Sequence, residues 1–150
     1  IWQCSDPDPE HCRSIDSWIR HEQLTQTMPP ALQMDVRDTD WGQQLEAPAQ
    51  AVVAINLLHI SAWECTVALF TQAATLLPSG GILCIYGPFS VDGRHVSDSN
   101  RNFDASLRER NASWGVRDQT LVLQEAGAAG FSLQKISLMP ANNRMIRWVR

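Results

Sequence analysis

Short apolar runs alternate along the chain with stretches that have a helical period, and this alternation predicts the elements. Residues 51–55 form a continuous run rich in Val, which is typical of a strand buried on both faces of a parallel sheet. A stretch with helical periodicity follows, and a second apolar run occupies residues 82–86. Strand, helix and strand in this order indicate a βαβ unit, which binds ligands beyond the carboxyl ends of its strands.

The helix of this unit has a predicted start and a predicted end. Ser61 lies three residues before Glu64, the spacing of a capping box whose side chains satisfy N–H groups of the first turn. The expected apolar face consists of Trp63, Val67, Phe70, Ala74 and Leu77. The sequence Pro-Ser-Gly-Gly at 78–81 then ends the helix.

The first 48 residues predict another strand, helix and strand. Residues 1–4 are already in a strand pattern and lack an initiating Met, so we expect a fragment whose start has been lost. Asp8 is the expected N-cap of a helix that starts at Pro9 and ends at about Glu22. Residues 31–36 predict a short strand that ends in an acid.

The last third of the chain predicts a long loop, a helix and a hairpin. Residues 89–117 are rich in Gly, Ser, Asn, Asp and Arg, and they predict a loop with one helical turn at 102–110. Asp118 is expected to cap a helix through Ala129 that Gly130 ends. Residues 131–138 and 144–149 predict an antiparallel hairpin.

Composition narrows the class of protein. A chain of 150 residues that is 44% hydrophobic and 19% charged suffices for a single domain over 1–150. The net charge of −4 argues against a nucleic-acid partner, and the apolar runs are too short to span a membrane. Four cysteines without ligand spacing favour buried thiols in a reducing cytoplasm over disulfides, and the sequence predicts no metal site.

The order of elements, with its terminal hairpin, resembles the class I S-adenosylmethionine-dependent methyltransferase fold. Eight motifs that follow one another along the chain carry a closer resemblance. They are Trp2-Gln3-x-Ser5-Asp6, Ser14-Ile15-Asp16-x-Trp18, Leu32-x-x-Asp35-Val36, Ile55-Asn56-Leu57-Leu58-His59-Ile60-Ser61-x-Trp63, Tyr86-Gly87-Pro88-Phe89, Ser99-Asn100-x-x-Phe103-Asp104, Trp114-Gly115-Val116-Arg117-Asp118 and Met139-Pro140-Ala141-Asn142-Asn143. Together they resemble the methyltransferase-like protein 26 family over nearly the whole chain.

This resemblance implies an α/β fold with a Rossmann-like, mostly parallel sheet and an antiparallel C-terminal hairpin. Its first strand, glycine-rich loop and first helix would be missing from this chain. The implied cofactor is S-adenosylmethionine, and because the missing loop approaches the cofactor most closely, we expect weak binding by the fragment alone.

The resemblance also implies which residues bind the cofactor. Asp6, with Asp8 as the fallback, would hold the ribose hydroxyls, and Asp35 with Val36 would contact the adenine. The methionine end and the methyl group would be lined by Asn56, Leu57 and His59. Helix capping is the alternative role of Asp6 and Asp8, and a solvated acid at a strand end is the alternative for Asp35.

Catalysis and acceptor binding give a second group of candidates. His59 is a candidate general base because its ordinary pKa suits proton removal, and Tyr86 could share its pocket. Structural hydrogen bonding is the alternative for both residues. The candidate acceptor-binding residues are Asn100, Asp104, Arg117, Asn142 and Asn143, on a substrate lid or, alternatively, in turns and caps. The five Arg between 94 and 117 could clamp a carboxylate or phosphate, or form a solvated face.

The expected function is S-adenosylmethionine-dependent methyl transfer to a small-molecule acceptor. A non-catalytic adenosyl-ligand or protein-binding module on the same fold is an alternative, because a fold does not determine a function. A nucleotide-dependent oxidoreductase is a further alternative function. The oligomeric state is left open.

Overall fold

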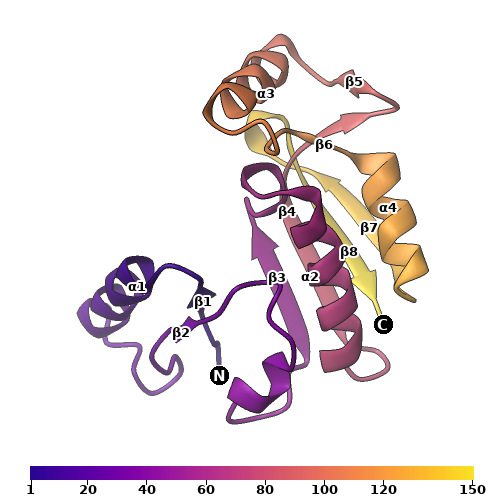
Figure 1. Ribbon diagram of the computed structural model, residues 1–150. Helices are drawn as coiled ribbons and strands as arrows, with labels where there is room; N and C mark the ends of the chain where they lie inside the picture. Colours follow the sequence, from indigo (N-terminus) through magenta and orange to yellow (C-terminus); the bar gives the residue numbers. More distant parts are fainter. The chain divides into compact units, whose positions relative to one another are not determined.

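The structure, a computed structural model, describes all residues from 1 to 150 and divides them into two compact units. The first unit is residues 1–47 and the second is residues 48–150 (Figure 1). The expectation of a single domain over 1–150 stays a prediction. No helix in either unit combines the length and the apolar character needed to cross a membrane.

The first unit contains one helix and two short parallel strands. Helix α1 (Pro9–His21) starts as predicted, because the Asp8 carboxylate accepts a hydrogen bond from the backbone N–H of Glu10 at 2.7 Å. Strand β1 (Ser5–Asp6) pairs in parallel with β2 (Leu32–Gln33), and the 3-10 helix η1 (Trp41–Gln44) follows. The helix buries Cys12 and Ile19.

Both strands of this unit are shorter than predicted. Residues 1–4 form no strand, and only two residues of the predicted strand 31–36 pair. Pro7 directly follows β1 and Pro30 lies two residues before β2, and neither has an N–H to extend the ladder. Asp35 and Val36 therefore lie in a turn rather than at the end of a strand.

The second unit is built on a mixed six-stranded sheet. Its main strands are β3 (Ala51–Ile55), β4 (Ile82–Val91), β7 (Ser132–Leu138) and β8 (Asn143–Val149), in the spatial order β3-β4-β8-β7. β3 is parallel to β4, and β8 is antiparallel to both of its neighbours, so β3, β4 and β7 point the same way. The predicted βαβ unit and the C-terminal hairpin are confirmed.

Helices pack against this sheet, and aromatic rings meet in the core between them. The helices of the unit are α2 (Trp63–Leu76), α3 (Asp98–Arg110) and α4 (Gln119–Ala128), with the 3-10 helices η2 (Leu58–Ile60) and η3 (Pro140–Asn142). Helix α2 contacts α4, and α4 contacts β4 and β7 (Figure 1). In the core, the ring of Phe70 lies edge-on to the ring of Trp148 at 5.6 Å and 6.2 Å from that of Phe131.

Two predictions about the βαβ unit are wrong. β3 is an edge strand of its sheet, and Ala54 is its only buried residue, so it is not buried on both faces. The predicted capping box does not form, because α2 begins after Ala62 with no side-chain cap. The hydroxyl of Ser61 instead donates to the carbonyl oxygen of Leu57 at 2.9 Å, which closes the turn of η2.

The segment 89–117 is more ordered than the predicted loop. β4 continues to Val91, and two short strands, β5 (Arg94–His95) and β6 (Arg117–Asp118), pair with its end. Helix α3 begins at Asp98, four residues before the predicted turn, because the Ser97 hydroxyl caps it by accepting from the N–H of Asn100. The Asp118 cap of α4 is confirmed: its carboxylate accepts from the N–H of Thr120 at 2.9 Å.

Candidate functional site

A pocket of about 510 Å³ lies in the second unit, beyond the carboxyl end of β3. Ten residues line it: Asn56, His59, Ile60, Pro88, Ser99, Asn100, Phe103, Arg110, Ala141 and Asn143. They come from the segment after β3, the end of β4, helix α3 and the β7–β8 turn. This is the edge at which open α/β sheets bind ligands.

The turn after β3 presents Asn56 and His59 to the pocket. Asn56 has a φ of 57°, in the left-handed region that Asn tolerates better than most residues. Its backbone N–H donates to the carbonyl oxygen of Tyr86 at 2.9 Å, which extends the register of β3 and β4 by one residue. The chain then turns into η2, which carries His59.

Bonds from a distant segment hold η2 in place. Nε of Arg117 donates to the carbonyl oxygen of Leu58 at 2.9 Å, and Nη2 donates to that of Ser61. The N–H of Gly115 donates to the carbonyl oxygen of His59 at 3.0 Å. Arg117 was predicted to recognise the acceptor, but it does not line the pocket, and these carbonyl oxygens occupy its guanidinium.

His59 is buried and uncharged at neutral pH. The residue is 5% exposed, and burial, with the nearby positive charge of Arg117, lowers the pKa of its imidazole from 6.5 to about 4. The ring lies edge-on to the ring of Phe103, with centroids 5.5 Å apart, and accepts no hydrogen bond from the chain. A neutral imidazole can accept a proton from a ligand, but the lowered pKa makes it a weak base.

Asn100, Asn143 and Tyr86 differ in how they relate to the pocket. Asn100 is 5% exposed, lines the pocket, and has a buried side-chain Nδ2 with no hydrogen-bond partner. Asn143 also lines it and donates through Nδ2 to the hydroxyl of Tyr86 at 3.0 Å. Tyr86 itself is not a lining residue, so its hydroxyl orients Asn143.

The other two acceptor candidates lie outside the pocket. The buried carboxylate of Asp104 accepts from the backbone N–H of Val116 at 2.6 Å and from Nε of Arg108 at 3.0 Å. Asn142 is exposed and donates to the hydroxyl of Ser99 at 3.5 Å, the limit of a hydrogen bond. Asp104 therefore ties α3 to the segment that holds η2.

Sequence reasoning missed six lining residues: Ile60, Pro88, Ser99, Phe103, Arg110 and Ala141. Phe103 was recognisable as an isolated apolar residue in a polar stretch, and Arg110 belonged to the Arg-rich segment. Ile60, Pro88 and Ala141 carry no chemical signal of a site, so only the fold identifies them.

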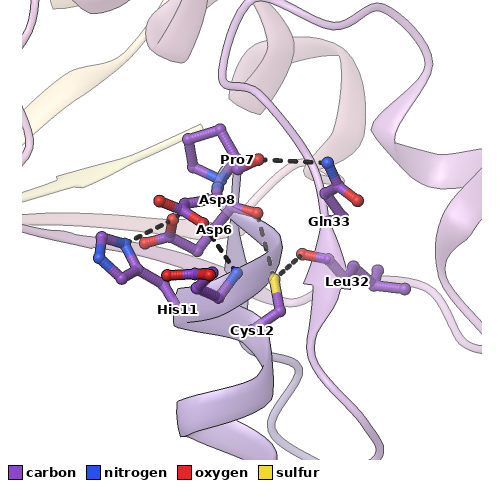
Figure 2. A network of polar contacts seen from close by, with 8 residues as sticks. Asp6, Pro7, Asp8, His11, Cys12, Leu32 and Gln33 are labelled. Atoms are coloured by element: carbon purple, nitrogen blue, oxygen red, sulfur yellow. Dashed lines mark hydrogen bonds and ion pairs between the residues drawn. The ribbon is translucent and has the colours of Figure 1, made fainter.

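The adenosine candidates lie in the first unit. Oδ1 of Asp6 accepts from the backbone N–H of Asp8 at 2.9 Å and lies 3.1 Å from Nδ1 of His11. Figure 2 shows Asp6 and His11 side by side at the start of α1. Asp8 is the helix cap. The second oxygen of Asp6 has no partner in the chain, so the carboxylate can still accept a hydroxyl hydrogen bond.

Asp35 is held by its neighbour. Its two oxygens accept from Nε and Nη2 of Arg37 at 2.9 and 2.7 Å. These hydrogen bonds, with one from the backbone N–H of Arg37, lower the pKa of Asp35 from 3.8 to about 2. Contact of Asp6, Asp35 and Val36 with a cofactor stays a prediction.

Comparison with known proteins assigns the family. Residues 1–150 match the family model described as "Protein of unknown function (DUF938)". The chain belongs to this family. The DUF938 chain is also similar in structure to an O-methyltransferase family protein from Burkholderia thailandensis, with a TM-score of 0.79 and 16% identity over 100% of this chain and 42% of the other.

Two further structures are similar to the DUF938 chain. An O-methyltransferase family 2 protein from Planctomyces limnophilus, in complex with apigenin, matches with a TM-score of 0.81 and 15% identity over 98% of this chain and 42% of the other. An O-methyltransferase from neocarzinostatin biosynthesis, in complex with S-adenosylmethionine and a naphthoic acid, matches with a TM-score of 0.74 and 14% identity over 98% and 40% of the two chains.

These matches establish the fold of the DUF938 chain. Its mixed α/β sheet with an antiparallel C-terminal hairpin matches the sheet of these O-methyltransferase structures, which confirms the predicted fold class. The DUF938 chain spans about two fifths of the length of these structures.

Proposed function

We propose that this protein transfers a methyl group from S-adenosylmethionine to a small-molecule acceptor bound in the pocket of the second unit. The observation that carries the proposal is the position of the neutral His59 and of Asn56 beyond the carboxyl end of β3, in a methyltransferase fold. The sequence motifs support a more specific proposal, membership of the methyltransferase-like protein 26 family.

The chain offers suitable groups for the cofactor. The free oxygen of Asp6 is suited to the ribose hydroxyls, and Asn56 and Leu57 are suited to the methionine end. Both oxygens of Asp35 already accept hydrogen bonds from Arg37. A hydrogen bond from the adenine amine would therefore be an additional bond to one of these oxygens. When bound, S-adenosylmethionine supplies the reactive methyl group on its sulfonium.

The pocket residues would position and deprotonate the acceptor. Ile60, Pro88 and Phe103 provide apolar walls, and holding the acceptor oxygen in line with the methyl group supplies much of the rate. His59 would take the proton of the acceptor hydroxyl onto its neutral ring. Asn143, oriented by Tyr86, would fix the acceptor further.

One observation favours the alternative of a non-catalytic binding module. No carboxylate of the chain hydrogen-bonds the ring of His59, and its pKa of about 4 limits its strength as a base. Such a module would bind the adenosyl ligand and an acceptor-sized molecule without turnover.

Calorimetric titration with S-adenosylhomocysteine tests the cofactor half of this proposal. The wild type should bind, and the neutral variant Asp6→Asn should bind at least about tenfold more weakly, the usual cost of losing a charge-assisted hydrogen bond. Asp40→Asn is the control, because Asp40 is exposed and its side chain caps no helix. Equal affinities of Asp6→Asn and the wild type would show that Asp6 only orders the start of α1.

A further inference from the structure

The pocket of the second unit has an unusual charge for this protein. The chain carries a net charge of −4, yet no Asp or Glu lines the pocket. Arg110 is the only charged residue among the ten that line it, because His59 is neutral at neutral pH. The local charge of the pocket is therefore positive, opposite in sign to that of the chain.

Arg110 has no anionic partner, unlike its neighbours on α3. Arg101 forms an ion pair with Asp98 at 2.9 Å, and Arg108 pairs with Asp104 at 3.0 Å. The guanidinium of Arg110 donates through Nε to a backbone carbonyl oxygen at 3.3 Å and lies over the ring of Trp114 at 5.9 Å. Its two terminal nitrogens make no hydrogen bond within the chain, so they are available for a bidentate bond to a carboxylate.

Asn100 lines the pocket with a second polar side chain, but its Nδ2 is fully buried and has no hydrogen-bond partner. An atom that solvent cannot reach offers no contact to a ligand in the open pocket. Arg110 therefore supplies the charged contact of the pocket.

Apolar side chains supply part of the remaining surface of the pocket. Phe103 and Ile60 are 37% and 44% exposed although both line the pocket, and Pro88 is buried beside them. An aromatic ring, an aliphatic side chain and a proline together suit the face of a flat, unsaturated molecule.

We propose that the acceptor is a small planar hydroxy acid, whose ionised carboxylate binds Arg110. The inference rests on the proposed function for the identity of the reacting hydroxyl. The binding of the acid itself needs only the pocket, so acid binding and methyl transfer can be tested separately.

The test uses two probe acids, para-hydroxybenzoate and para-coumarate, each with its uncharged methyl ester. Ligand-observed NMR titrations with the wild-type protein at neutral pH should show that at least one acid binds, about tenfold or more tightly than its ester. Arg110→Gln should remove this preference for the acid and leave the affinity for the ester unchanged. Arg101→Gln is the matched control, since it removes the same charge from an exposed position of the same helix outside the pocket.

Equal binding of acid and ester, no binding of either acid, or equal effects of the two Arg variants would overturn the inference. Binding of S-adenosylhomocysteine, measured on the same samples, reports separately on the proposed function: acid binding without it would retain the pocket assignment and refute methyl transfer.

Discussion

The Nε atom of Arg117 donates a hydrogen bond of 2.9 Å to the carbonyl oxygen of Leu58, the residue before His59. The two residues are 59 positions apart in the sequence. This bond and the one to Ser61 fix both ends of the 3-10 turn that carries His59. The position of the candidate base therefore depends on the segment between α3 and α4.

We expect Arg117→Gln to destabilise the protein and to change the titration of His59. The variant loses charge-assisted bonds to backbone carbonyls, each worth about 1.5–3 kcal/mol. It also removes a positive charge that lowers the pKa of His59, so that pKa should rise toward 6.5. Denaturant unfolding and an NMR titration of the imidazole measure the two effects. An unchanged pKa together with unchanged stability would show that the contact has no energetic role.

The buried imidazole of His59 should make the stability depend on pH. Its pKa is about 4 in the folded state and near 6.5 when unfolded, so the unfolded chain binds the proton more tightly. The free energy of unfolding should therefore decrease as the pH falls from about 6.5 toward about 4, by an amount on the order of 1–3 kcal/mol. His59→Gln should have a flatter profile in this window, and equal slopes of the two proteins would contradict the burial of the ring.

Asp104→Ala should cost much more stability than Asp98→Ala. Removing the Asp104 carboxylate leaves the buried N–H of Val116 unpaired, at a cost of about 2–4 kcal/mol. It also breaks the bond that joins α3 to the segment between α3 and α4. Asp98 lies on the same helix in an exposed ion pair, and such pairs contribute little. Urea unfolding of both variants compares them directly. Similar losses would mean that the Asp104 bonds are solvated.

Two glycines should respond in opposite directions to alanine. A Cβ on Gly115 would lie 2.6 Å from Nη2 of Arg108 and 2.8 Å from Oδ1 of Asp104, and its φ of 152° disfavours a side chain. We expect Gly115→Ala to cost more than about 1 kcal/mol. Gly127 lies in helix α4 with open space around it, so Gly127→Ala should add roughly 0.5–1 kcal/mol. Thermal melting distinguishes the two, and a stabilised Gly115→Ala would contradict the described contact.

Local signals in the sequence predicted the elements whose ends depend on near neighbours. Asp8 before Pro9 and Asp118 before Thr120 cap their helices as expected, because a cap involves only residues two or three positions away. Ser61 has the same kind of spacing and does not cap, because the intervening turn of η2 takes its hydroxyl. A spacing rule cannot detect that competing bond.

The candidate site was only partly predictable, for a related reason. Asn56 and His59 were recognisable because they directly follow an apolar run with the pattern of a strand. Pro88 and Phe103 join them from two separate segments, β4 and α3, and their proximity depends on the packing of α3 above the sheet edge. Asp104 and Arg117 showed the polar character of site residues, but their bonds serve the backbone instead.

The most direct test of the proposed function follows a labelled methyl group from S-adenosylmethionine. The protein is incubated with the methyl-labelled donor and a low-molecular-mass metabolite extract, and the products are separated by mass. We predict a labelled small molecule that forms only with the protein, that is greatly reduced with His59→Gln, and that is lost when the planar acids are removed from the extract. Tight binding of S-adenosylhomocysteine without any labelled product would contradict methyl transfer and support a binding module.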